Sequence, residues 1–125
     1  MSEVSKNEEA AKLFTQGTHH MEISVIYIVQ NIFYGEKYSR TISLNCQYII
    51  LFKNIRDASQ VHILARQMYP QHPCILIHAY EKATSIAFGY LLIDLHPQTL
   101  DSRTRLQTNI FPKEKRTFYQ PLPSL

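Results

Sequence analysis

The chain has 125 residues, a formal charge of +3 and 45% hydrophobic residues, which is typical of one modest globular unit with a real core. No apolar run approaches the roughly 20 residues that a membrane helix needs, and residues 1–9 carry neither a secretory signal nor an Arg-rich transit peptide. We therefore expect an intracellular protein, nuclear or cytoplasmic, that is not secreted and has no membrane partner.

The first half of the chain predicts one helix and one strand. Ser5 and Glu8 have the spacing of a capping box, and Gly17 stands where a helix would end, so a helix is expected over residues 5–16. The segment EISVIYIV, residues 22–29, is β-branched and apolar at almost every position, as in a strand that is covered on both faces. We expect it to be an internal parallel strand. The connection that follows, up to residue 46, gives only a weak signal for a short helix.

The middle of the chain predicts a strand and two helices. YIILF, residues 48–52, has the composition of a buried strand. Asp57 suits the cap of a helix whose apolar residues recur at helical spacing up to Met68, and Pro70 ends it. Pro73 suits the first turn of a second helix to about residue 84. The run of Ile, Leu and Ile at residues 75–77 also fits a strand, but the length of the segment favours a helix.

Two further strands are expected, YLLID at residues 90–94 and a fourth at 104–111. Strands separated by helical segments predict an α/β domain over residues 1–111, with a mostly parallel sheet flanked by helices. Residues 112–125 read as a flexible Pro- and Lys-rich tail with little to bury. A parallel sheet needs helices on both faces, and the predicted helices are too few to cover four strands. We therefore expect part of the sheet to be uncovered, as if a piece of the domain were missing.

The cysteines and histidines give no metal site. Cys46 and Cys74 are far apart without CxxC spacing, so we expect two buried thiols. The six histidines follow no recognised ligand spacing, and the adjacent His19 and His20 fit a satisfied loop pair. The basic residues are scattered, which ranks a nucleic-acid module last among the functions considered.

The order of the segments LFTQGTHH, ISVIYIVQNIF, SRTISLNCQYIILFKNIRD, LARQMYP and FGYLLIDLHP resembles the C-terminal half of FtsK/HerA-type DNA-packaging ATPases of Polinton and adintovirus-like elements. The resemblance covers about residues 13–112 and implies a partial P-loop NTPase, a RecA-like sheet that lacks the N-terminal P-loop half. The intact family uses ATP and Mg²⁺ and acts on double-stranded DNA. This chain has no GxxxxGK[ST] and no paired acids after a strand, so it is not expected to bind a cofactor or to hydrolyse ATP alone.

The same resemblance implies roles for five residues. Gln30 matches the polar sensor of the family, and Arg56 matches an element from which an arginine finger could act in trans. Arg40, Asn45 and Asp57 match segments at the subunit interface. The residues alone favour a plainer interpretation, in which Gln30 ends a strand and starts a turn, and Arg56 and Asp57 surround the start of a helix on the surface.

Two functional hypotheses follow. The first is a truncated packaging ATPase that at most joins a full-length ATPase ring, forms a homo-oligomer or contacts DNA. The alternative is a free-standing intracellular protein-interaction domain derived from a mobile element, with no nucleotide chemistry.

Overall fold

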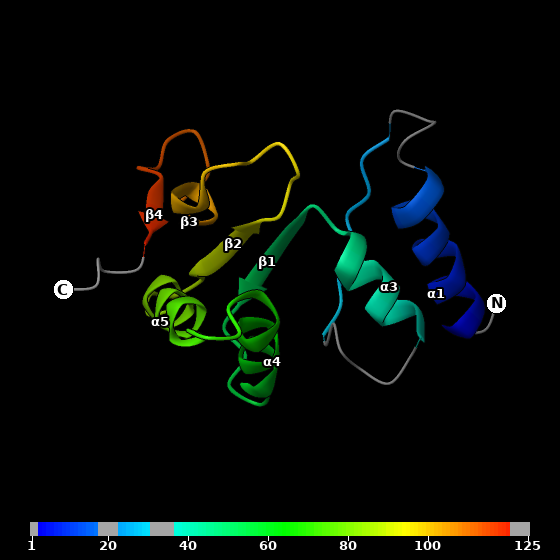
Figure 1. The fold of residues 1–125 in the computed structure, drawn as a ribbon, viewed down its shortest axis with the longest axis horizontal. Coiled ribbons are helices and arrows are strands. Elements are labelled where there is room, and N and C mark those ends of the chain that lie inside the picture. The colour runs from blue at the N-terminus through cyan, green and yellow to red at the C-terminus, as the bar shows by residue number, and fades with distance from the viewer. Residues whose placement is uncertain (1–2, 18–22, 31–36, 121–125) are drawn as a thin grey trace. The chain divides into compact units, whose positions relative to one another are not determined.

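The computed structural model describes residues 3–17, 23–30 and 37–120, with side chains from residues 8–15, 23–30 and 41–120. It divides into two compact units, Met1–Cys46 and Gln47–Leu125 (Figure 1), and each unit is described by itself.

The described residues of the first unit include two α-helices. Helix α1 (Glu3–Lys12) continues into a π-helical turn, Leu13–Gly17, which confirms the helix predicted over residues 5–16. Helix α3 (Lys37–Asn45) packs against α1, and it lies where the sequence gave only a weak helical signal. Ala11 of α1 and Ile42 of α3 are buried, so the small core of this unit lies between its helices.

The predicted internal strand at residues 22–29 is wrong. Residues 23–29 form neither a helix nor a strand, and the side chains of Ile26 and Ile28 are 88% and 91% exposed. A strand is stable only beside a neighbour that shares its backbone hydrogen bonds, and the described sheet is built from strands within residues 48–119 alone. Composition makes this segment capable of forming a strand but supplies no neighbour for it.

The second unit contains a four-stranded sheet and two helices. The strands are β1 (Tyr48–Phe52), β2 (Tyr90–Asp94), β3 (Leu106–Thr108) and β4 (Thr117–Tyr119). The helices are α4 (Ser59–Met68) and α5 (Cys74–Ala83), and a short 3₁₀ turn, Ser102–Thr104, precedes β3. The predicted strands at 48–52 and 90–94 and both predicted helices are confirmed. The fourth predicted strand is shortened to β3, and residues 117–119, which the sequence assigned to a tail, form β4.

The direction of the strands overturns the predicted fold. The sheet has the order β1-β2-β3-β4 and every neighbouring pair is antiparallel, so the mostly parallel RecA-like sheet is wrong. The connection between two parallel strands usually contains one helix, which returns the chain to the end where the first strand began. Two helices lie between β1 and β2. The second helix carries the chain back to the end of the sheet where β1 finished. Strand β2 must therefore run opposite to β1, as Figure 1 shows.

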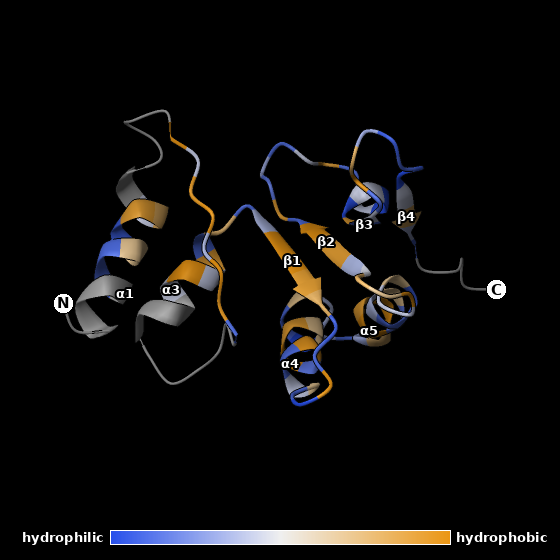
Figure 2. Ribbon diagram, turned by 180° about the vertical axis from the view of Figure 1, so that it is seen from behind, coloured by the Kyte–Doolittle hydropathy of each residue, from blue (hydrophilic) through white to orange (hydrophobic). Residues whose placement is uncertain are grey.

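The core of the second unit lies between the helices and one face of the sheet. Helix α5 packs against β2 and β3, and α4 packs against α5. Leu76 of α5 is fully buried together with Leu91, Ile93 and Leu106 of the strands. Figure 2 shows that β1 and β2 are largely hydrophobic and lie beside these helices. Among the described helices, none combines the length and the apolar character that crossing a membrane requires.

Candidate functional site

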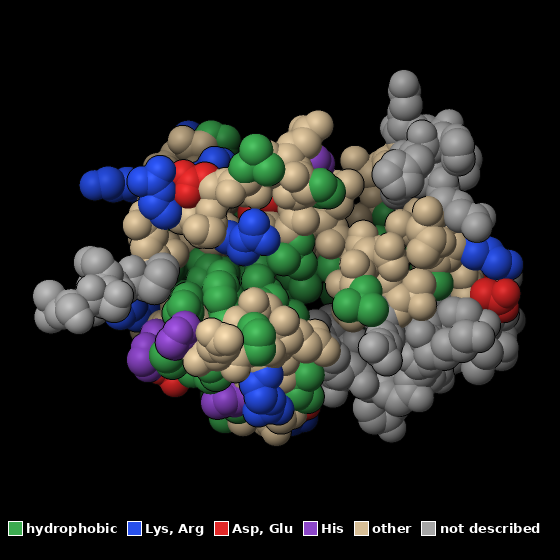
Figure 3. All heavy atoms as spheres, viewed as in Figure 1, with side chains coloured by type: hydrophobic (Ala, Val, Ile, Leu, Met, Phe, Trp, Pro, Cys, Tyr) green, Lys and Arg blue, Asp and Glu red, His purple; other side chains and the backbone are tan. Residues whose placement is uncertain are grey.

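Strand β1 is an edge strand whose outer face is apolar and exposed. It pairs with β2 on one side and is the first strand of the sheet. The side chains of Tyr48, Ile50 and Phe52 alternate along it and are 52%, 47% and 64% exposed, whereas Ile49 between them is buried. In Figure 3, hydrophobic side chains reach the visible surface of this unit above α4 and α5. We call Tyr48, Ile50 and Phe52 with the free backbone edge beside them the β1 surface.

The register of the sheet also shows which backbone groups lie on the free edge. The Leu95 N–H donates to the Gln47 carbonyl at 2.8 Å, so Gln47 and every second residue after it direct their backbone groups toward β2. Tyr48, Ile50 and Phe52 then direct theirs away from the sheet. The contacts of Tyr80 agree with this outward direction of the Phe52 backbone. The Tyr80 hydroxyl donates to the Phe52 carbonyl at 3.1 Å and accepts from the Asn54 N–H at 3.2 Å. Tyr80 therefore uses one lone pair of the Phe52 carbonyl, and among the described residues the outward backbone groups of Tyr48 and Ile50 have no backbone partner.

Aromatic rings continue the β1 surface across the sheet. The ring of Phe52 lies 6.1 Å from that of Tyr90 on β2, and Tyr90 makes an edge contact with Phe111 at 6.2 Å. Tyr90 is held in place because its hydroxyl accepts from the Ile110 N–H at 3.0 Å. Phe111 is exposed, so the row of rings ends in solvent. The row offers a partner contiguous aromatic area in which Tyr90 is held by a hydrogen bond.

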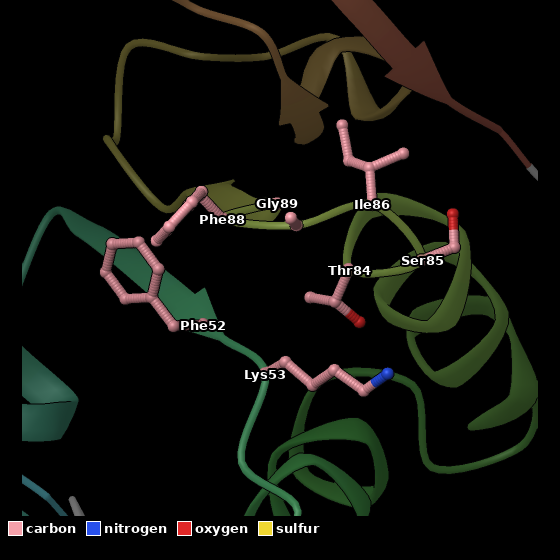
Figure 4. A pocket seen from close by; sticks show the side chains of 8 residues that line it. Phe52, Lys53, Thr84, Ser85, Ile86, Phe88 and Gly89 are labelled. Atoms are coloured by element: carbon pink, nitrogen blue, oxygen red, sulfur yellow. The ribbon is translucent and has the colours of Figure 1, made fainter.

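A hollow of about 340 Å³ lies at the end of β1. Its lining combines the end of β1 with the turn after α5, namely Phe52, Lys53, Thr84, Ser85, Ile86, Ala87, Phe88 and Gly89. Figure 4 shows Phe52 and Phe88 on one side of it, with the Lys53 side chain extending beneath Thr84. The hydroxyls of Thr84 and Ser85 donate to the carbonyls of Tyr80 and Lys82, so they cap the end of α5. The exposed lining of the hollow is therefore more polar than apolar, with the rings of Phe52 and Phe88 and the Lys53 cation among it.

The turn that lines this hollow is tightly constrained. Phe88 has φ of 60° although it is not glycine, and its side chain is 96% exposed. A Cβ added to Gly89 would lie 2.2 Å from the Ala83 carbonyl oxygen, so only glycine fits there. A left-handed backbone at a bulky residue costs free energy, and such residues cluster at binding sites. The turn thus holds an exposed aromatic ring beside the end of the β1 surface.

Three of the residues that the resemblance singled out lie in the first unit. Gln30 is exposed at the end of the segment 23–30, which forms no strand that it could terminate as a sensor. Asn45 ends α3 and donates from Nδ2 to the Thr41 carbonyl at 2.8 Å, so its amide caps its own helix. Arg40 lies within α3, and its side chain is outside the described residues.

The other two lie in the second unit, in the bend between β1 and α4. The backbone N–H groups of Arg56 and Asp57 both donate to Asn54 Oδ1, at 3.1 and 3.2 Å. Arg56 is exposed, and the ion pairs found among the described residues, Lys12–Glu8 and Arg103–Asp101, do not include it. These contacts fix the backbone of the bend but give the guanidinium no described partner on its own chain.

Asp57 lies two residues before Ser59, the first residue of α4, and the N-cap position is Ala58, so the cap predicted at Asp57 is displaced by one residue. The Asp57 carboxylate accepts from the Ser59 N–H at 3.0 Å and from the Ser59 hydroxyl. These hydrogen bonds, first from the hydroxyl and then from the backbone, lower the pKa of the Asp57 carboxyl. The described contacts of Asp57 thus give it a structural role at the first turn of the helix.

The thiols and acids of the described residues form no metal site. Cys74 is exposed at the start of α5, which corrects the prediction of a buried thiol. Cys46 is partly buried, burial raises the pKa of its thiol, and its Sγ donates to the Ser43 carbonyl at 3.2 Å. The buried carboxylate of Asp94 accepts from the His96 N–H and the Thr99 hydroxyl, which holds the loop after β2. Throughout the described ranges, no three histidine, cysteine or acidic residues gather closely enough to hold a metal ion. His19 and His20 lie outside the described residues.

No family model, curated protein or solved structure matches this chain. The geometry of the β1 surface is therefore the main guide to function. Sequence reasoning expected part of the sheet to be uncovered but did not place that part on β1, because YIILF is apolar at every position, as in a strand that is buried on both faces.

Proposed function

We propose that this chain is an intracellular protein-interaction domain that binds an extended segment of a partner along the free edge of β1. The observation that carries the proposal is the exposure of Tyr48, Ile50 and Phe52 on a strand that, within the described part of the chain, has a neighbour on one side only. Proteins usually cover or charge such an edge, because unpaired backbone groups and apolar side chains favour association.

The geometry suits addition of a strand. The outward backbone groups of Tyr48 and Ile50 would bind the main chain of the partner and supply affinity. The alternating apolar side chains and the hollow beside Phe52 would accept every second side chain of the partner and supply specificity. Because β1 contains no charged residue, the matching segment should itself be apolar and uncharged.

The hypothesis of a packaging-ATPase fragment implied a mostly parallel sheet, which the described residues do not form, but the function itself stays an untested prediction. Gln30 ends no strand and Arg56 contacts no described acid, so no contact of the described residues favours association with an ATPase ring. That the chain alone neither binds nor hydrolyses ATP stays a prediction. Micromolar binding of Mg·ATP in a calorimetric titration would contradict it.

The test is selection of displayed peptides on the immobilised chain, followed by binding measurements with purified peptides. We expect the selected peptides to carry apolar residues at alternate positions and to bind the chain with micromolar affinity. Replacing Ile50 by proline removes the N–H at the middle of the free edge and should abolish binding. The matched control is Leu100→Pro in an exposed loop far along the chain from β1. Equal binding to the wild type and to Ile50→Pro would reject the proposal.

A further inference from the structure

The β1 edge is compatible with the edge of a second copy. Antiparallel pairing of two identical strands requires that the residue on the two-fold axis direct its backbone groups outward, and Ile50 at the middle of β1 does so. With Ile50 opposite Ile50 of the second copy, Tyr48 lies opposite Phe52 at both ends. The pairs Ile50–Ile50 and Tyr48–Phe52 direct their backbone groups at the partner and exchange N–H···O=C bonds, whereas Ile49 and Leu51 form the non-hydrogen-bonded pairs between them. The Phe52 carbonyl, which already accepts from Tyr80, keeps a second lone pair for this purpose.

The side chains are complementary in the same register. The outer face reads aromatic, isoleucine, aromatic, so the two-fold axis places an aromatic ring beside an aromatic ring at each end and isoleucine beside isoleucine between them. Cross-strand pairs of this kind stabilise an antiparallel ladder. Each ring of Tyr48 would also lie beside Phe52 of the other copy, at the mouth of the hollow.

The charges do not oppose the pairing. Strand β1 has no charged residue, and the first cation after it is Lys53. The register places Lys53 opposite Gln47 of the second copy, so the two lysines do not face each other. Like charges directly opposite would have destabilised the ladder.

We propose that two copies of this chain associate through isologous antiparallel pairing of β1, with Ile50 on the two-fold axis, to form one continuous sheet. The inference rests on the proposed function, because it names the partner of the same edge. It commits to a second copy, whose strand matches the edge in backbone phase, side-chain alternation and charge. A pairing of two five-residue strands is small, so the dimer should be weak and dependent on concentration.

Single-cysteine variants test both the contact and its register. In a background with Cys46→Ser and Cys74→Ser, Ile50→Cys should form a covalent dimer under mild oxidation with copper phenanthroline, because hydrogen-bonded partners have Cα atoms about 5.5 Å apart. The expected rate exceeds by roughly 10²-fold that of Phe88→Cys and Ile28→Cys, two exposed positions outside β1, because association raises the effective concentration. Equal crosslinking of the three variants would overturn the proposal.

The register is tested by mixing two variants. Tyr48→Cys alone should crosslink slowly, since the two copies of residue 48 would lie roughly 14 Å apart along the strands. Tyr48→Cys mixed with Phe52→Cys should yield a covalent heterodimer. If Ile50→Cys does not crosslink while selected peptides still bind the edge, self-pairing is rejected and the proposed function stands. If peptides also fail to bind, both are rejected.

Discussion

Strands β1 and β2 have the same length and nearly the same composition, yet they meet opposite environments. In β2 the last four of five residues are buried, whereas in β1 Ile49 is buried and Tyr48, Ile50 and Phe52 are exposed. Strand β2 lies between β1 and β3 and packs against α5, whereas β1 pairs only with β2 in the described sheet. Position in the sheet, more than composition, therefore decides whether an apolar strand is buried in the core or exposed on the surface.

The largest expected effect follows truncation in β2. Leu91 is fully buried on the face that α5 covers, so Leu91→Ala removes buried methyl groups and leaves a cavity. We expect a loss of roughly 2–5 kcal/mol in the free energy of unfolding, measured by urea denaturation. A loss no larger than that of Leu100→Ala, which is exposed, would show that β2 is not the core strand.

The turn that leads into β2 should be the next most sensitive position. In Gly89→Ala the new Cβ meets the Ala83 carbonyl oxygen, which belongs to backbone and cannot rotate away. The expected loss in the free energy of unfolding is about 1–3 kcal/mol, as for other overpacked sites. Ala87→Ser in the same turn is exposed and serves as the control, which should unfold like the wild type. An unchanged midpoint for Gly89→Ala would contradict this geometry.

Truncation on the β1 surface should affect stability less. Ile50 and Leu92 are partners across the ladder, but Leu92 is buried and Ile50 is about half exposed. Measured at a concentration low enough to keep the chain monomeric, Ile50→Ala should cost about 1 kcal/mol or less. Leu92→Ala should cost clearly more, and equal costs would mean that the two strands are buried alike.

The smallest effect is expected at the bend that leaves β1. Because hydrogen bonds from Ser59 lower the pKa of Asp57 in the folded chain, its carboxylate stabilises the fold at neutral pH. That contribution is lost as the pH falls below the ordinary aspartate value of about 3.9 and through the lower folded pKa. The gap in melting temperature between the wild type and Asp57→Asn, measured by thermal denaturation, should therefore narrow toward pH 3. A gap that persists unchanged there would exclude the carboxylate charge as its cause.

The sequence predicted the elements of the second unit better than their arrangement. Apolar runs located β1 and β2, and helical spacing located α4 and α5, because these signals are local. The relative direction of β1 and β2 depends on how many helices connect them. Both connecting helices were predicted, but the antiparallel direction of β2 that follows from them was not. The segment at residues 23–29 shows the same limit, since composition alone names no hydrogen-bonding neighbour.

The predicted site residues were located less well than the helices and strands. Gln30 and Arg56 came from a resemblance; Gln30 follows a segment that forms no strand, and the role of Arg56 in a neighbouring subunit stays a prediction. Asp57 was predicted from local capping chemistry; it lies one residue before the N-cap of α4, where its carboxylate still accepts from the N–H of Ser59. The β1 surface could not be read from YIILF, because exposure of one face follows from the edge position of the strand.

Amide hydrogen exchange of β1, followed by NMR at two protein concentrations, tests the central claim most directly. At low concentration the Ile50 N–H should exchange fast, because it lies on the free edge, while the N–H groups of Ile49 and Leu51 are protected by β2. At high concentration Ile50 alone of these residues should become markedly slower as the edges pair. Protection of the Ile50 amide equal to that of its neighbours at the lowest concentration, or exchange at Ile50 that stays fast at every concentration, would contradict the account.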